Sequence, residues 1–107
     1  METGCVVVCT TLSAKASVEM FAETLVAERL AACVNVFAEM ESVYRWKGAI
    51  ERDRERQVLI KTTAERLPAL EARLRALHPY EVPELLVLPV IGGSERYLAW
   101  LRDSTRP

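Results

Sequence analysis

The sequence predicts an α+β fold built in the order strand, helix, strand, strand, helix, strand, which is the split βαβ plan. Three features indicate it. A β-branched run at residues 5–9 precedes a segment with helical spacing, a long hairpin is centred on Lys47-Gly48, and residues 77–84 separate a leucine-spaced helix from an apolar strand. A short C-terminal helix follows. At 107 residues, the chain is expected to form a single domain covering residues 1–107.

Residues 4–11 form the first expected strand. The run Cys5-Val6-Val7-Val8-Cys9 is apolar on both faces, which is typical of a central strand. Ser13 is the expected N-cap of the following helix, and that helix should end near residues 30–32. The residues expected on its inner face are Val18, Phe21, Ala22, Leu25, Val26 and Arg29.

Residues 33–46 and 49–63 are the expected arms of the hairpin, although propensity alone favours a helix over residues 51–57. Gly48 tolerates the positive φ that a two-residue turn needs. Side chains of one parity are expected to share a face in the first arm: Val34, Val36, Ala38, Met40, Tyr44 and Trp46. In the return arm Glu51, Asp53 and Glu55 alternate with Arg52, Arg54 and Arg56. That alternation predicts a solvated or intersubunit ladder of salt bridges.

The hairpin is too long for the helices beside it. A 14-residue strand reaches about 45 Å, whereas a 15-residue helix covers about 22 Å. The tip should therefore project with its apolar side chains bare, and such a surface normally finds a partner. We expect an oligomerisation arm with Tyr44 and Trp46 at the interface.

The stretch Leu77-His78-Pro79-Tyr80-Glu81-Val82-Pro83-Glu84 contains functional side chains where a turn needs none. Pro79 ends the helix expected around residues 68–77, and Pro83 leads into a strand at residues 85–90. After Gly92-Gly93, Ser94 is the expected cap of the last helix. Right-handed crossovers make the first and third strands central, which brings residues 9–11, the hairpin tip and residues 78–84 to one rim.

Composition excludes several classes of protein. Fourteen basic and fifteen acidic side chains give a net charge of −1, so we expect no nucleic-acid partner. No apolar run approaches the roughly 20 residues of a membrane helix, and no secretory signal is visible, so we expect a cytoplasmic protein without a membrane partner. Cys5 and Cys9 are too far apart in one strand to bridge, while pairing of Cys33 stays open.

Five segments of the chain, in order, resemble the CutA family of divalent-cation tolerance proteins. They are AERLAACVNV at 27–36, SVYRWKG at 42–48, LIKTT at 59–63, HPYEVPE at 78–84 with Leu88-Pro89-Val90, and YLAWL at 97–101. The resemblance implies a ferredoxin-like subunit and a homotrimer whose hairpins wrap neighbouring subunits. It also implies a part in metal tolerance, with copper binding in some members. The architecture is similar to that of the PII signalling proteins, which bind nucleotides in clefts between subunits.

The resemblance also implies candidate site residues. Cys9 and His78 match two positions of the copper-binding members, whereas Leu77 stands where those members carry a first histidine. A thiolate and an imidazole suit copper or another divalent metal. The alternatives are structural roles: Cys9 as a buried apolar side chain, and His78 as a partner for the negative end of a helix. No organic cofactor is evident.

A second candidate site rests on Lys61, which ends an otherwise apolar strand and needs a carboxylate or an anionic ligand. Lys61, Tyr80 and Glu81 are the expected cleft residues of a PII-like sensor of small anions, the alternative to metal binding. A structural assembly module is the third hypothesis. The chain lacks a nucleophile with a base and an acid, so we expect no enzyme.

Overall fold

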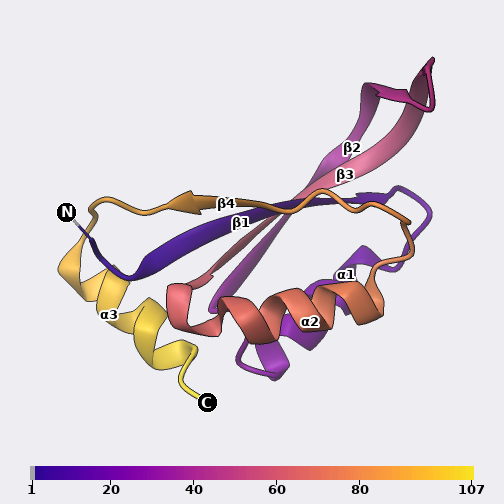
Figure 1. Ribbon diagram of the computed structural model, residues 1–107. Helices are drawn as coiled ribbons and strands as arrows, with labels where there is room; N and C mark the ends of the chain where they lie inside the picture. Colours follow the sequence, from indigo (N-terminus) through magenta and orange to yellow (C-terminus); the bar gives the residue numbers. More distant parts are fainter. Residues whose placement is uncertain (1) are drawn as a thin grey trace.

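The computed structural model describes residues 2–107, and it has the expected order of elements (Figure 1). They are β1 (Cys5–Ser13), α1 (Val18–Ala27), β2 (Cys33–Trp46), β3 (Ala49–Thr63), the short 3₁₀ helix η1 (Ala64–Arg66), α2 (Leu67–Leu77), β4 (Leu86–Pro89) and α3 (Glu95–Ser104). Among residues 2–107, no helix has both the length and the apolar character that crossing a bilayer requires.

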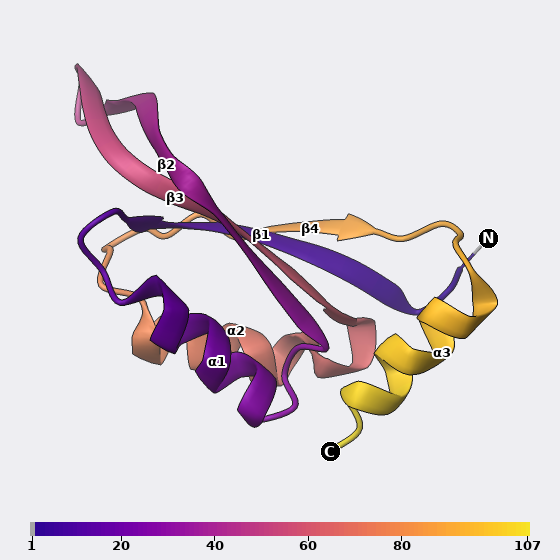
Figure 2. The same cartoon turned by 180° about the vertical axis from the view of Figure 1, so that it is seen from behind.

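The four strands form one antiparallel sheet in the order β2-β3-β1-β4. This order confirms that the first and third strands are central. Helices α1 and α2 lie side by side against one face of the sheet (Figures 1 and 2). The core between the layers includes Val8, Leu25, Ile60 and Leu70, whose side chains are fully buried.

Helix α1 is shorter at both ends than the sequence predicts. Ser13 is the last residue of β1, and its hydroxyl accepts a hydrogen bond from the backbone N–H of Lys15 at 3.2 Å, so it does not cap the helix. The helix ends at Ala27 because Arg29 adopts a positive φ of 60°. That turn lets the Leu30 N–H bond to the Leu25 carbonyl at 3.0 Å and buries Leu30. Val26, expected on the inner face, is exposed.

The turn at Lys47-Gly48 is confirmed. Both residues have positive φ, 49° and 83°, as a two-residue hairpin requires. The joined arms extend beyond the helical layer (Figures 1 and 2), and the chain measures 44 × 27 × 24 Å.

A β-bulge interrupts β2 halfway along the hairpin. Val36 pairs with Val58 but Glu39 pairs with Arg56, so two β2 residues stand opposite Gln57. The exposed carbonyl of Phe37 accepts a bond from Arg56 Nε at 2.8 Å. The predicted single face of β2 is therefore wrong: Val34 and Val36 pack on the core, whereas Met40, Tyr44 and Trp46, beyond the bulge, face the other side.

The C-terminal segment forms the other edge of the sheet. All four residues of β4 are exposed, although its sequence is apolar. Ser94 caps α3 as predicted, since its hydroxyl accepts a bond from the Tyr97 N–H at 3.3 Å. Helix α3 packs through Leu98 and Leu101 in a second, smaller core with Cys5 and Ala32.

Substitutions of Leu25 and Met20, which both lie on α1, test the packing of the core. Leu25 is fully buried and Met20 is 69% exposed. Leu25→Ala should lower the free energy of unfolding by about 2–5 kcal/mol because it leaves a cavity, while Met20→Ala should change it by less than about 0.5 kcal/mol. Urea unfolding at one protein concentration measures both, and equal losses would contradict this packing.

Candidate functional site

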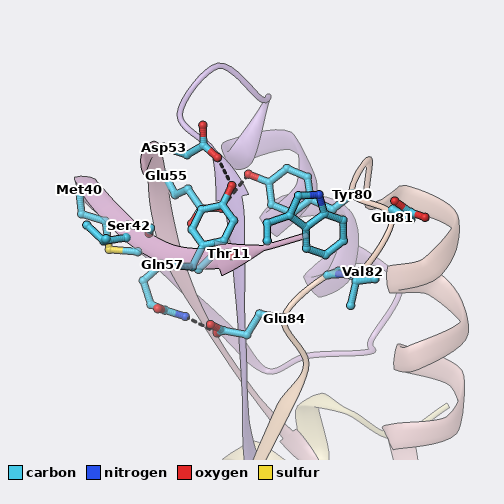
Figure 3. Close-up of a pocket in the computed structure, with 14 residues that line it drawn as sticks. Thr11, Met40, Ser42, Asp53, Glu55, Gln57, Tyr80, Glu81, Val82 and Glu84 are labelled. Carbon is cyan, nitrogen blue, oxygen red and sulfur yellow. Dashed lines mark hydrogen bonds between the residues drawn. The ribbon is translucent and has the colours of Figure 1, made fainter. Parts of the chain in front are cut away.

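A groove of about 610 Å³ lies between the outer half of the hairpin and the loop at residues 80–84 (Figure 3). Its walls are aromatic and apolar, and include Tyr44, Trp46 and Tyr80. Four carboxylates also line it, from Asp53, Glu55, Glu81 and Glu84. The groove therefore combines residues predicted as interface anchors with residues predicted as cleft ligands.

The bulge in β2 creates this combination. Directly opposite residues of an antiparallel pair project to the same face. Beyond the bulge Met40 pairs with Glu55 and Ser42 with Asp53, so the outer half of β2 shares a face with the acidic residues of β3. Without the offset, the same β2 side chains would lie on the face of the core.

Hydrogen bonds connect the loop that follows α2 to the two central strands, β1 and β3. Tyr80 reaches β3 and donates its hydroxyl to Glu55 Oε2 at 2.7 Å. The Gln57 side-chain amide donates both to the Thr10 carbonyl at 2.8 Å and to Glu84 Oε2 at 2.9 Å. These bonds hold the groove walls together, and Glu55 is only 7% exposed.

His78 has a structural role at this site. Its Nδ1 accepts a hydrogen bond from the Tyr80 N–H at 3.2 Å, and Nε2 lies 2.6 Å from the Thr11 carbonyl. These partners define the neutral tautomer with the proton on Nε2, because a carbonyl accepts and an N–H donates. Both ring nitrogens are therefore occupied, and the imidazole is buried.

Cys9, the other residue predicted as a metal ligand, lies in the central strand β1. Cys9 follows core residue Val8 in β1, so its side chain lies on the sheet face away from α1 and α2. Burial, followed by the charge of Glu84, raises the pKa of the Cys9 thiol, which disfavours the thiolate that metals bind. Among residues 2–107, no three His, Cys, Asp or Glu side chains are grouped to hold a metal ion.

Lys61, the basic residue of the predicted cleft, does not line the groove, whereas Glu81 does. Lys61 is level with Val7 and Cys33, near the end of β3 that adjoins α3. Its Nζ is 6.0 Å from the centre of the Tyr97 ring. The groove lining described here contains no Lys or Arg.

Sequence reasoning overlooked Asp53, Glu55, Gln57 and Glu84 as site residues. The signal was present in the alternation of residues 51–56, because acidic residues at every second position of a strand form one acidic face. The arginines of residues 51–56 form part of the predicted ladder of salt bridges. Arg52 pairs with Glu41 at 2.7 Å, and Arg54 with Glu39 at 3.7 Å.

The carboxylates of the groove hold two phenols in the neutral form. The hydrogen bond to Asp53, with burial and nearby acids, raises the pKa of Tyr44 to about 12. Burial and then the bond to Glu55 raise the pKa of Tyr80 far above its usual value. Chemically, the groove presents negative charge and neutral donors, which suits a cation rather than an anion.

An alkaline titration tests these two phenols. Their native pKa values exceed the unfolded value of about 10, so the stability they contribute is complete below pH 10 and is lost as the pH rises through the native values. Tyrosinate absorbance of the native protein should show a component near pH 12 that Tyr44→Phe removes. Tyr97→Phe is the control, and ionisation of Tyr44 and Tyr80 near pH 10 in the folded protein would contradict the bonds.

Comparison with known proteins identifies relatives along nearly the whole chain. A family model described as CutA1 divalent ion tolerance protein matches residues 6–104. The divalent-cation tolerance protein CutA of Thermus thermophilus is 46% identical over 99 residues, which are 92% of this chain and 96% of that protein. The chloroplastic CutA protein of Arabidopsis thaliana is 43% identical, and the match covers 94% of this chain but 56% of that longer protein.

Solved structures give the same result for the fold. The Thermus thermophilus structure, a divalent cation tolerance protein, superposes with a TM-score of 0.91 and 44% identity, covering 95% of this chain and 99% of the other. That of CutA1 from Shewanella sp. SIB1 superposes with a TM-score of 0.93 and 34% identity over the full length of both chains. The predicted α+β fold and the predicted resemblance are both confirmed, and the chain belongs to the CutA1 divalent ion tolerance protein family.

Proposed function

We propose that this chain contributes to divalent-cation tolerance by gathering divalent cations in the acidic groove. The observation that carries the proposal is that three carboxylates of the groove accept hydrogen bonds from neutral donors. Asp53, Glu55 and Glu84 accept bonds from the neutral donors Tyr44, Tyr80 and Gln57. A neutral donor orients a carboxylate without cancelling its charge, so the negative charges of the groove add.

Acidic residues on the other face of the same hairpin have cationic partners instead of neutral ones. Glu39 and Glu41 pair with Arg54 and Arg52, which cancels their charges. The bulge separates these two sets of acids onto opposite faces. A concave surface lined by uncompensated charge of one sign concentrates ions of the other sign.

The chemistry of the groove favours weak binding of hydrated ions. Its carboxylates do not form a closed cage of ligands, and each of three is committed to one hydrogen bond. Hard divalent cations retain water readily and are held by one or two carboxylates in such sites. We therefore expect dissociation constants on the order of 10⁻⁴ to 10⁻³ M that weaken with added salt.

Calorimetric titration with Mn²⁺, Zn²⁺ and Cu²⁺ tests this function. Asp53→Asn combined with Glu81→Gln removes two groove charges, while Glu23→Gln combined with Glu95→Gln removes two exposed charges elsewhere. The groove variant should bind about thirtyfold more weakly, because each of the two lost carboxylates removes attraction of about 1 kcal/mol in a solvated site. The control variant should bind as the wild type does.

The alternatives predict different titrations. A thiolate and imidazole site would select Cu²⁺, resist salt and be lost in Cys9→Ala, and that pattern would contradict the groove. Binding of a nucleotide without binding of cations would favour the PII-like sensor. Its expected residue Lys61 is absent from the groove lining, which is why we prefer cations.

We also propose that the chain works as a homotrimer. The observation that supports it is the apolar character of both sheet edges. Exposed apolar side chains follow β4 and its flanks, namely Val82, Leu85, Leu86, Val87, Leu88 and Ile91, and others lie on the hairpin, namely Phe37, Val43 and Ile50. A free, apolar edge strand pairs readily with another chain.

Light scattering checks the assembly. The wild type should have about three times the 12.0 kDa mass of the chain. Leu86→Lys combined with Leu88→Lys should shift the mass toward that of a monomer, because buried lysines without partners are costly. Met20→Lys, on an exposed site of α1, should leave the mass unchanged. A wild-type monomer at micromolar concentration would contradict the trimer.

A further inference from the structure

A second cavity, of about 320 Å³, lies at the end of the sheet that adjoins α3. It is formed where β1 begins, β3 passes into η1, and α3 ends. Its charged lining residues are Glu65, Arg66, Arg102 and Arg106. We propose that this cavity, which we call the arginine pocket, binds a phosphate-type oxyanion.

Backbone contacts orient two of the arginines. Arg102 donates from Nε and Nη2 to the Thr3 carbonyl, at 3.2 and 2.8 Å. Arg66 donates from Nε to the Arg29 carbonyl at 3.4 Å. These bonds occupy one edge of each guanidinium and leave Nη1 of Arg102 and both Nη groups of Arg66 for a ligand. A planar guanidinium held in this way is suited to the paired oxygens of phosphate.

The side chains that line the pocket carry a net positive charge. They include three guanidinium groups and one carboxylate, that of Glu65, and Arg106 also pairs with Asp103 at 2.8 Å on an exposed surface. Exposed pairs of this kind are worth little, so Arg106 can turn to a ligand at small cost. The pocket thus has the opposite sign to the acidic groove.

The helix ends at the pocket add to this preference. Helix α2 begins directly after Arg66, has no acidic residue in its first turn, and among residues 2–107 receives no side-chain cap. The Leu67 N–H is bonded to the Ala64 carbonyl and Pro68 has no N–H, so this helix end contributes only the field of its dipole to the pocket. The negative end of α3 is covered by donors, since Arg29 Nη1 bonds the Asp103 carbonyl at 3.3 Å and the Thr105 hydroxyl bonds the Leu101 carbonyl at 3.0 Å.

Calorimetric titration with inorganic phosphate at constant ionic strength tests the proposal. The wild-type protein should bind phosphate saturably, and Arg66→Gln combined with Arg106→Gln should weaken binding about tenfold, because two charge-assisted hydrogen bonds are lost. Arg45→Gln combined with Arg96→Gln removes the same charge from exposed sites outside the pocket and should bind normally. Arg106→Gln alone should show part of the loss, and it should leave the fold intact because the Arg106 side chain is 74% exposed.

Three results would overturn the proposal. They are a titration without saturation, equal losses in both double variants, and displacement of phosphate by an equal concentration of chloride. Either of the last two results would mean that the protein attracts anions in general and that the arginine pocket is not a specific phosphate site. Because the arginine pocket and the acidic groove share no residue, failure here would leave the cation proposal standing.

Discussion

The one-residue offset between Val36 and Glu39 determines which side chains of the hairpin lie together. Before the bulge β2 adds valines to the core, and after it β2 turns its aromatic residues toward the acidic face of β3. In a strand of regular alternation, the valines and the aromatic residues would share one face. The bulge lets one strand contribute to two surfaces, and Arg56 stabilises it by bonding the Phe37 carbonyl and Glu19 on α1.

The distribution of charge over the two faces of the hairpin depends on the same offset. Acidic residues on one side of the hairpin pair with arginines, while those in the groove are held by phenols and an amide. The groove therefore keeps its negative charge, although the whole chain has a net charge of only −1. At the other end of the sheet, the arginine pocket is positive. A near-neutral protein thus presents two separate surfaces of opposite sign.

Local chemistry made much of the fold predictable. The valine run of β1, the Lys47-Gly48 turn and the Ser94 cap each depend on neighbouring residues, and each appears as expected. The end of α1 was not predictable, because Arg29 takes a positive φ that its residue type disfavours.

The site was harder to predict than the fold. Apolar alternation in β2 continues through the bulge, so nothing in the pattern marks the change of face. Tyr80 and Glu81 lie at the rim with the hairpin, as expected. Lys61 lies level with Val7 of β1, a position that depends on the register of β3. No sequence motif specifies the two hydrogen bonds that the imidazole of His78 forms with backbone atoms.

Paramagnetic broadening of backbone amide signals by Mn²⁺ tests the central claim most directly, because it locates the bound cation without a substitution. If the bulge-built groove gathers cations, substoichiometric Mn²⁺ will first broaden the amides of residues 43–44, 53–55 and 80–84, and added salt will reverse the effect. Broadening centred on Cys9, or spread evenly over exposed acids such as Glu23 and Glu95, would contradict the account.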